Sequence, residues 1–190
     1  DRDFNHPAII GWCPLNEVWD LRDKKPFADN VKNIYYTTKA IDSTRPCIDV
    51  SGGIHTVTDI FDVHDYDQDP EKLRAKYAPF ADGGPLHDRL VENQVKYTGR
   101  QTYKGEPCFV SEYGGIAFAM SDDAWGYGKN HPETKEEFYA RFIGLTDAIL
   151  DNPKFFGLCY TQLTNVEQEQ NGLYTYDRKP KMDMAIIKQI

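Results

Sequence analysis

Two apolar segments of this sequence each end in a glutamate. The first covers residues 10–17 (Ile-Gly-Trp-Cys-Pro-Leu-Asn-Glu) and the second covers residues 108–112 (Cys-Phe-Val-Ser-Glu). An apolar run of this length predicts a buried strand, and in parallel α/β folds ligands bind at the carboxyl ends of the strands. A lone glutamate in such a place is usually a surface or ion-pair carboxylate. Glu17 and Glu112 together, however, are the minimal apparatus for cleaving a glycosidic bond.

The rest of the sequence supplies the elements that would position these carboxylates. Apolar runs predict five strands, at residues 8–15, 47–50, 60–63, 108–111 and 155–160. Helical spacing of apolar residues predicts helices at residues 29–41, 86–103 and 132–150, and the start of another at 182–190. The proline- and glycine-rich residues 68–85 predict a polar loop. This alternation predicts an α/β fold with a parallel sheet, built as one unit over residues 1–190 with no second domain.

Size and charge narrow the class of protein. The 190 residues suffice for one core, but a complete (β/α)₈ barrel typically needs about 250. The net charge of -8 argues against a nucleic-acid or anionic-membrane partner. The polar start predicts that no signal peptide opens the chain. The four cysteines form no CxxC pair; we expect four buried thiols, which favours a reducing compartment such as the cytoplasm.

Three motifs in order resemble the family-2 glycoside hydrolases, the β-galactosidase, β-glucuronidase and β-mannosidase group. Residues 3–12 followed by Asn16-Glu17 resemble the acid/base segment of that family, and residues 110–114 resemble its nucleophile segment. Residues 171–174 and 177–181 resemble the stretch after the last barrel strand. The resemblance implies a (β/α)₈ TIM barrel, of which this chain would supply strands 4 to 8, the C-terminal half.

The resemblance also implies a role for each matching residue. Glu17 would be the acid/base, and Asn16 would hydrogen-bond the 2-hydroxyl of the sugar. Glu112 would be the nucleophile, and Tyr66 would hydrogen-bond it. Tyr160 stands where many members of the family have a tryptophan that forms part of the floor of the sugar subsite.

Three further residues are candidates on position alone. His64 and Asp65 precede Tyr66 at the same sheet edge, where they either contact sugar hydroxyls or serve a structural role. Trp125 lies in the long loop after Glu112, and loops on that face of a barrel build the site. Trp125 is therefore either a platform for a sugar ring or a packing residue of its own loop.

The sugar is predicted from the stretch that follows the last strand. Glucuronidases of the family usually carry an Asn-x-Lys element there, whereas residues 166–172 are acidic and contain no lysine. Two carboxylates would repel a uronate, which favours a neutral sugar, with a β-galactoside as the first choice; a β-glucuronide and a β-mannoside are the alternatives within the family. The expected reaction is a double displacement with retention and needs no cofactor.

Two other classes of function compete with this one. His55, His64, Asp65 and Asp67 are of metal-ligand type, but they lack a recognised spacing, so we expect no metal site. Alternatively, the chain is an inactive fragment or a carbohydrate-binding remnant. A half-barrel exposes sheet edges and apolar core, so we expect its partner to be the rest of the catalytic domain or a second copy.

Overall fold

The computed structural model describes residues 2–18, 25–87 and 99–190. They form two compact units. The first comprises Asp1–Val63 and Leu86–Phe109, and the second comprises His64–Pro85 and Val110–Ile190. Because the division falls within two strands, after Val63 and after Phe109, each unit is described separately below.

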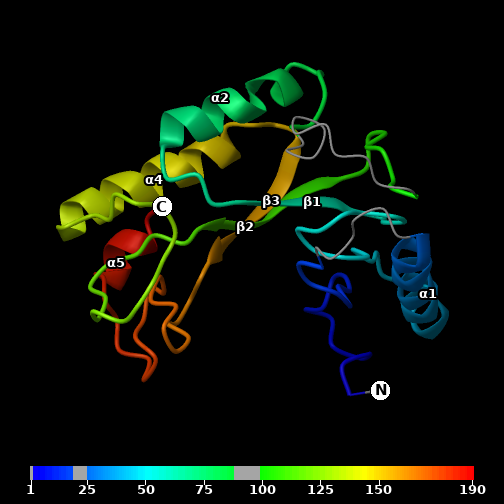
Figure 1. The fold of residues 1–190 in the computed structure, drawn as a ribbon, viewed down its shortest axis with the longest axis horizontal. Coiled ribbons are helices and arrows are strands. Elements are labelled where there is room, and N and C mark those ends of the chain that lie inside the picture. Colours follow the sequence, from blue (N-terminus) through cyan, green and yellow to red (C-terminus); the bar gives the residue numbers. More distant parts are fainter. Residues whose placement is uncertain (1, 19–24, 88–98) are drawn as a thin grey trace. The chain divides into compact units, whose positions relative to one another are not determined.

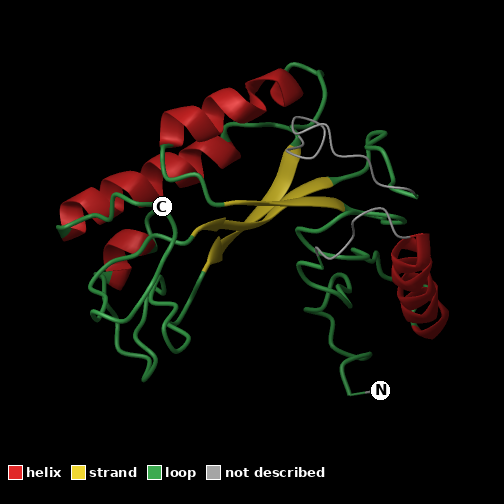
Figure 2. Cartoon of the chain, in the orientation of Figure 1, coloured by secondary structure: helices red, strands yellow, loops and turns green. Residues whose placement is uncertain are grey.

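Helices and strands alternate along the chain, as the sequence predicts (Figure 1). The elements are α1 (Lys25–Ile41), β1 (Phe61–Asp65), α2 (Pro70–Ala81), β2 (Cys108–Gly114), α4 (Lys135–Leu150), β3 (Phe155–Thr161) and α5 (Met184–Ile187). The three strands form one parallel sheet in the order β1-β2-β3 (Figure 2). The α/β class is therefore confirmed.

The first unit contains α1 and two segments that pair without forming regular strands. The strands predicted at residues 8–15 and 47–50 appear only as two parallel bridges, Trp12 with Cys47 and Asn16 with Ser51. Pro14 lies between the two bridges and has no N–H to donate to a ladder. The chain therefore pairs on both sides of the proline but not through it.

The second unit is built around α4, which packs against α2 and β3. The polar loop predicted at residues 68–85 was wrong, because Pro70–Ala81 is helical. Asp69 caps this helix by accepting hydrogen bonds from the backbone N–H groups of Glu71 and Lys72, and a proline is favourable in the first turn. Leu73, Tyr77 and Phe80 are buried, at the spacing of one helical face.

The other predicted elements differ mainly in their ends. β1 and β2 run further than expected, so His64 and Glu112 lie within strands. α4 begins after the N-cap Thr134 rather than at residue 132. Most of the helix predicted at residues 86–103 lies at positions 88–98, outside the described residues, and residues 99–103 are not helical. The tail forms only the short α5.

Two smaller findings bear on the expectations from composition. Cys47 and Cys108 are buried, but Cys13 and Cys159 are exposed, so the prediction of four buried thiols was wrong. Cys159 lies on β3, none of whose residues is fully buried, and Cys13 lies beside the isolated bridge of Trp12 with Cys47. Across residues 2–18, 25–87 and 99–190, no helix is both long and apolar enough to cross a bilayer.

Candidate active site

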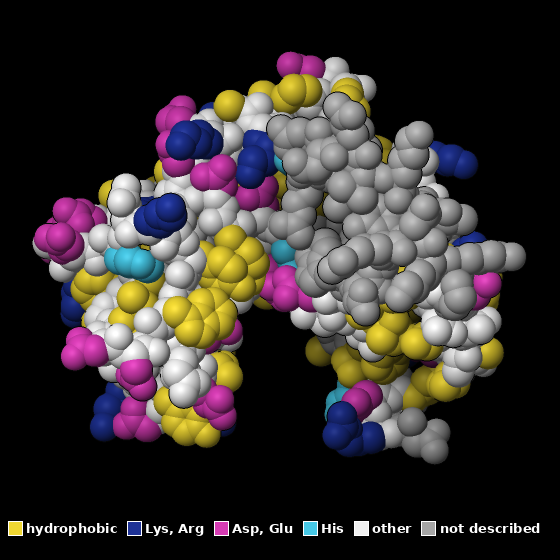
Figure 3. Space-filling view, viewed as in Figure 1, with side chains coloured by type: hydrophobic (Ala, Val, Ile, Leu, Met, Phe, Trp, Pro, Cys, Tyr) yellow, Lys and Arg dark blue, Asp and Glu magenta, His cyan; other side chains and the backbone are white. Residues whose placement is uncertain are grey.

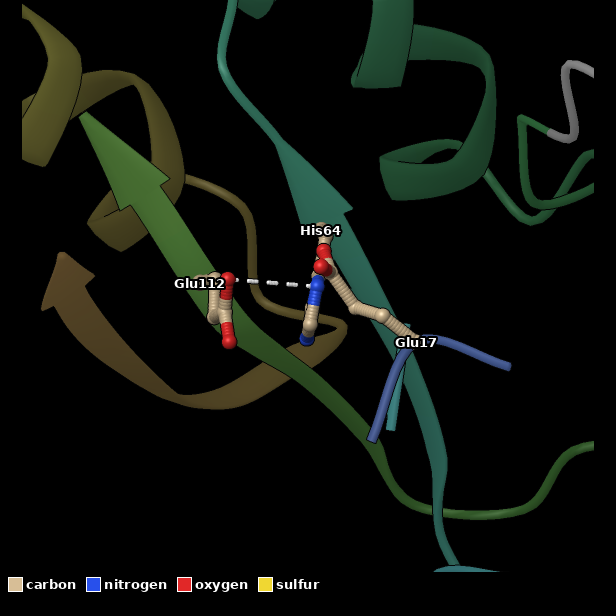
Figure 4. Close-up of side chains that lie close together, drawn as sticks. All are labelled: Glu17, His64 and Glu112. Carbon is tan, nitrogen blue, oxygen red and sulfur yellow. Dashed lines mark ion pairs between the residues drawn. The ribbon is translucent and has the colours of Figure 1, made fainter. Parts of the chain in front are cut away.

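Glu112 is the centre of a compact group of polar side chains in the second unit. Its carboxylate lies on β2 and is 24% exposed. The Tyr66 hydroxyl donates a hydrogen bond to Oε2 of Glu112. The buried His64, on the neighbouring β1, places Nδ1 3.3 Å from the same oxygen (Figure 4). Two side chains thus converge on one carboxylate oxygen, and the hydrogen bond from Tyr66 orients the Glu112 carboxylate.

Tyr66 is itself held in place by its surroundings. Burial and then the hydrogen bond to Glu112 raise the pKa of the phenol, so it remains a donor at neutral pH. Its ring stacks on that of Tyr127, with 3.5 Å between the centroids and 3° between the planes. The stacking fixes the ring plane and hence the direction of the hydroxyl.

Two glycines directly after the Glu112-Tyr113 pair make this packing possible. Gly114 and Gly115 have φ values of +86° and +61°, in the left-handed region that glycine adopts readily. A Cβ on Gly114 would collide with the ring of Tyr160, and one on Gly115 would collide with the rings of Tyr127 and Tyr66. The pair therefore lets aromatic rings approach the backbone beside the candidate nucleophile.

Trp125 occupies an ordered part of the loop after β2. Its backbone N–H donates to Gln168 (2.8 Å), and its carbonyl accepts from Gln170 (3.0 Å). The indole makes an edge contact with Tyr127 at 5.7 Å between centroids and is 48% exposed. The backbone is thus fixed while much of the ring stays open to solvent, as a platform for a sugar ring requires.

Several apolar side chains in the segments after β2 and β3 are exposed, Trp125 among them. Figure 3 shows hydrophobic side chains over the segments that follow β2 and β3; those exposed there include Trp125, Leu163, Val166 and Tyr176.

Tyr160 serves packing in this structure. Its hydroxyl accepts a hydrogen bond from the Ile116 N–H and donates one to the Asn171 carbonyl, each at 3.3 Å. Its ring lies against Phe142, with 4.8 Å between centroids, and burial raises the pKa of its phenol. Tyr160 therefore ties β3 to the turn after β2, and its predicted role as a subsite floor stays a prediction.

Glu17 and Asn16 belong to the first unit, where the backbone around them is tightly defined. The N–H of Glu17 donates to the Ser51 carbonyl, and the N–H of Ser51 donates to the Leu15 carbonyl, both at 2.8 Å. Glu17 has a φ of +48°, which is sparsely populated for a residue with a side chain and is often retained at functional positions. Asn16 is exposed.

The remaining candidate ligands have protein partners. Asp65 accepts from the Lys76 ammonium (2.8 and 2.9 Å) and from the Tyr77 hydroxyl (2.9 Å). Asp67 lies 3.3 Å from the same ammonium. These contacts give Asp65 a structural role between β1 and α2, whereas His64 faces Glu112.

Comparison with known proteins then decides the family. The whole chain, residues 1–190, matches the model of the TIM barrel domain of glycosyl hydrolases family 2. The chain belongs to this family. The family resemblance and the partial (β/α)₈ barrel fold expected from the sequence are therefore confirmed.

Individual family-2 proteins are related to this chain at low identity. A β-glucuronidase of Paenibacillus borealis is 26% identical over 204 residues, which cover 98% of this chain and 31% of that protein. A β-glucuronidase of Rattus norvegicus is 25% identical and covers 99% of this chain and 29% of that protein. The chain thus spans less than a third of the length of these relatives.

Solved structures of the family share the fold. The structure of a family-2 β-galacturonidase from Eisenbergiella tayi bound to glycerol has a TM-score of 0.67 at 17% identity, covering 99% of this chain and 34% of that one. A β-glucuronidase from Faecalibacterium prausnitzii has a TM-score of 0.62 at 21% identity and covers 99% of this chain and 32% of that one.

Proposed function

We propose that the whole protein is a retaining exo-β-glycosidase that hydrolyses terminal β-linked sugars. The proposal rests on one observation: Glu112 accepts a hydrogen bond from Tyr66. Both residues belong to a TIM barrel domain of glycosyl hydrolases family 2. A carboxylate that is held in one orientation by a neutral donor suits a nucleophile. Glu17, whose segment resembles the acid/base segment of the family, completes the pair.

The proposed mechanism has two displacements. Glu112 attacks the anomeric carbon, and Glu17 protonates the oxygen of the departing group, which leaves a glycosyl-enzyme ester on Glu112. Glu17, now a carboxylate, takes a proton from water, whose oxygen attacks the same carbon and releases the sugar with its original configuration. Asn16 would hydrogen-bond the 2-hydroxyl, and Trp125 would stack on a sugar ring.

For the sugar, we propose a β-glucuronide as the first candidate. The related curated proteins are β-glucuronidases, and the E. tayi protein is a β-galacturonidase, so the relatives do not support the β-galactoside preference that the sequence suggested. The acidic stretch also has a cation beside it. The Lys181 ammonium donates to the Gln170 carbonyl at 3.0 Å, and burial lowers its pKa to about 8, so it is mostly charged at pH 7.

A β-galactoside is the second candidate. Two carboxylates, Glu167 and Glu169, favour this neutral sugar. They lie just before Gln170, the residue whose carbonyl accepts the hydrogen bond from Lys181. Glu169 Oε1 accepts a hydrogen bond from the Asn171 amide at 3.1 Å, so this carboxylate is fixed beside the position where the family's glucuronidases usually carry a lysine. A fixed negative charge would oppose a uronate carboxylate more than a neutral sugar.

To test this, the full-length protein is assayed for hydrolysis of four substrates: the p-nitrophenyl β-glucuronide, β-galacturonide, β-galactoside and β-mannoside. NMR of the first-formed sugar reports the stereochemistry, and we expect the β-anomer. A Glu112→Gln variant should lose nearly all turnover, while a Glu133→Gln variant, changed at an exposed residue before α4, should keep it. An α-anomer as first product, or wild-type turnover by Glu112→Gln, would contradict the proposal. The ratio of glucuronide to galactoside activity separates the two candidate sugars.

A further inference from the structure

The first unit contains a buried group of three ionisable side chains that the proposed chemistry does not use. Asp49, His55 and Asp62 are all buried. The His55 ring lies between the two carboxylates, with Nδ1 2.7 Å from Asp49 Oδ1 and Nε2 3.2 Å from Asp62 Oδ1. Burying charged groups costs free energy unless they are paired. We therefore expect a role in which a rigid, paired cluster at this place is useful.

One end of the group is anchored to the backbone. Asp49 Oδ2 accepts from the N–H groups of Thr56 (2.7 Å) and Val57 (3.0 Å), and Oδ1 accepts from that of Val50 (2.8 Å). The His55 ring also makes an edge contact with Phe61 of β1, with 4.5 Å between centroids. Asp49 and His55 therefore have little freedom to move.

The other end leads to Glu17. Asp62 Oδ2 accepts from the Ser51 hydroxyl (2.6 Å) and from the Gly52 N–H (3.0 Å). Ser51 in turn is hydrogen-bonded through its backbone to both Leu15 and Glu17, which flank Asn16. A continuous chain of polar contacts thus starts at the anchored Asp49 and passes through His55, Asp62 and Ser51. It ends at Glu17, whose backbone is left-handed.

We infer that Asp49, His55, Asp62 and Ser51 are positioning residues that hold the Asn16-Glu17 segment in the geometry needed for acid/base catalysis. The inference rests on the proposed function, because it takes Glu17 as the acid/base. None of the four residues is assigned contact with substrate; they act through the backbone of Glu17. Fixing a strained backbone needs surroundings that over-determine it, and this cluster provides them.

The two neighbouring carboxylates favour the charged form of His55. Burial opposes a charge on His55, but the hydrogen bonds to Asp49 and Asp62 outweigh it and raise the pKa to about 9. Two thiols of the described residues, Cys13 and Cys108, also lie near Asp62; burial raises the pKa of both, that of Cys108 to about 12. His55 is therefore charged at pH 7.

The experiment compares two variants of the full-length protein, each of which loses one hydroxyl. Ser51→Ala removes the donor to Asp62, and the control Tyr35→Phe removes a donor to Asp59 at 2.7 Å in the same unit. Ser51 and Tyr35 are both 7% exposed. The readout is kcat/KM on two aryl glycosides of the hydrolysed sugar. The unsubstituted phenyl glycoside needs a proton on its leaving group, and the 2,4-dinitrophenyl glycoside does not.

We expect Ser51→Ala to lose about tenfold in kcat/KM on the phenyl glycoside and less than about twofold on the dinitrophenyl glycoside. Tyr35→Phe should change both rates equally or not at all. Ser51→Thr, which keeps a hydroxyl, should restore activity on the phenyl glycoside. Equal losses of Ser51→Ala on both substrates, or no loss on either, would overturn the inference and leave the cluster with a purely structural role.

Two further variants keep the test decisive. If Ser51→Ala does not fold, the isosteric Ser51→Cys, whose thiol is a weak donor, should show the same selective loss. Glu17→Ala tests the underlying proposal separately. If it loses no more activity on the phenyl than on the dinitrophenyl glycoside, Glu17 is not the acid/base, and the proposed function fails; if it shows the selective loss and the Ser51 variants do not, only the positioning role fails.

Discussion

Replacing Tyr66 by phenylalanine isolates the hydrogen bond to Glu112, the proposed nucleophile. The change removes the hydroxyl that donates to Glu112 Oε2 and keeps the ring that stacks on Tyr127. A hydrogen bond to a charged group contributes about 1.5–3 kcal/mol. Because His64 Nδ1 remains 3.3 Å from the same oxygen, we expect the lower part of that range. The predicted loss in kcat/KM is therefore about 10- to 50-fold.

The assay is steady-state hydrolysis of an aryl glycoside by the full-length protein. Tyr113→Phe is the matched control: its hydroxyl is hydrogen-bonded to Thr146 at 2.8 Å, so it changes the neighbouring residue without touching Glu112. The reasoning is refuted if Tyr66→Phe keeps full activity, or if both variants lose activity to the same extent.

Three other predictions follow from the same contacts. Gly115→Ala should abolish most activity and lower Tm, because the added Cβ would collide with the rings of Tyr66 and Tyr127. The control Gly105→Ala should only lower Tm, because Gly105 also has a positive φ (+105°) but has open space around it. Trp125→Ala should raise KM more than it lowers kcat, since the exposed ring would bind sugar and not the reacting atoms. For His55, the pKa raised from 6.5 to about 9 corresponds to about 3 kcal/mol of stability. That stability is fully present below about pH 6.5 and is lost as pH rises through about 9; chemical unfolding at pH 6 and pH 10 should show this loss in the wild type and not in His55→Gln.

The sequence predicted the elements whose apolar pattern is unambiguous. β2, β3 and α4 were located to within a few residues, because each is a hydrophobic run or stripe bounded by turn residues. α2 was missed because Pro70 and Pro79 suggested a loop. The cap at Asp69 and the proline in the first turn were the available signals for a helix start, and Pro79 lies in its last turn.

The candidate site was predicted in part. The resemblance placed Glu112 and Tyr66 together, and the structure contains that hydrogen bond. The stack of Tyr127 on Tyr66 was not predicted, because it joins segments that are far apart in sequence. The cluster around His55 was not predicted either: its members lie close together in sequence, but their spacing follows neither a helical nor a strand pattern. The Gly114-Gly115 pair was the visible sign that large side chains approach the backbone at this point.

In the proposed mechanism, Glu112 forms a covalent bond to the sugar. The most direct measurement is to treat the full-length protein with a 2-deoxy-2-fluoro glycoside bearing a good leaving group, and to identify the labelled peptide by mass spectrometry. We expect stoichiometric inactivation and a fluoroglycosyl ester on Glu112. A label on another carboxylate, with Glu112 unmodified, would contradict it.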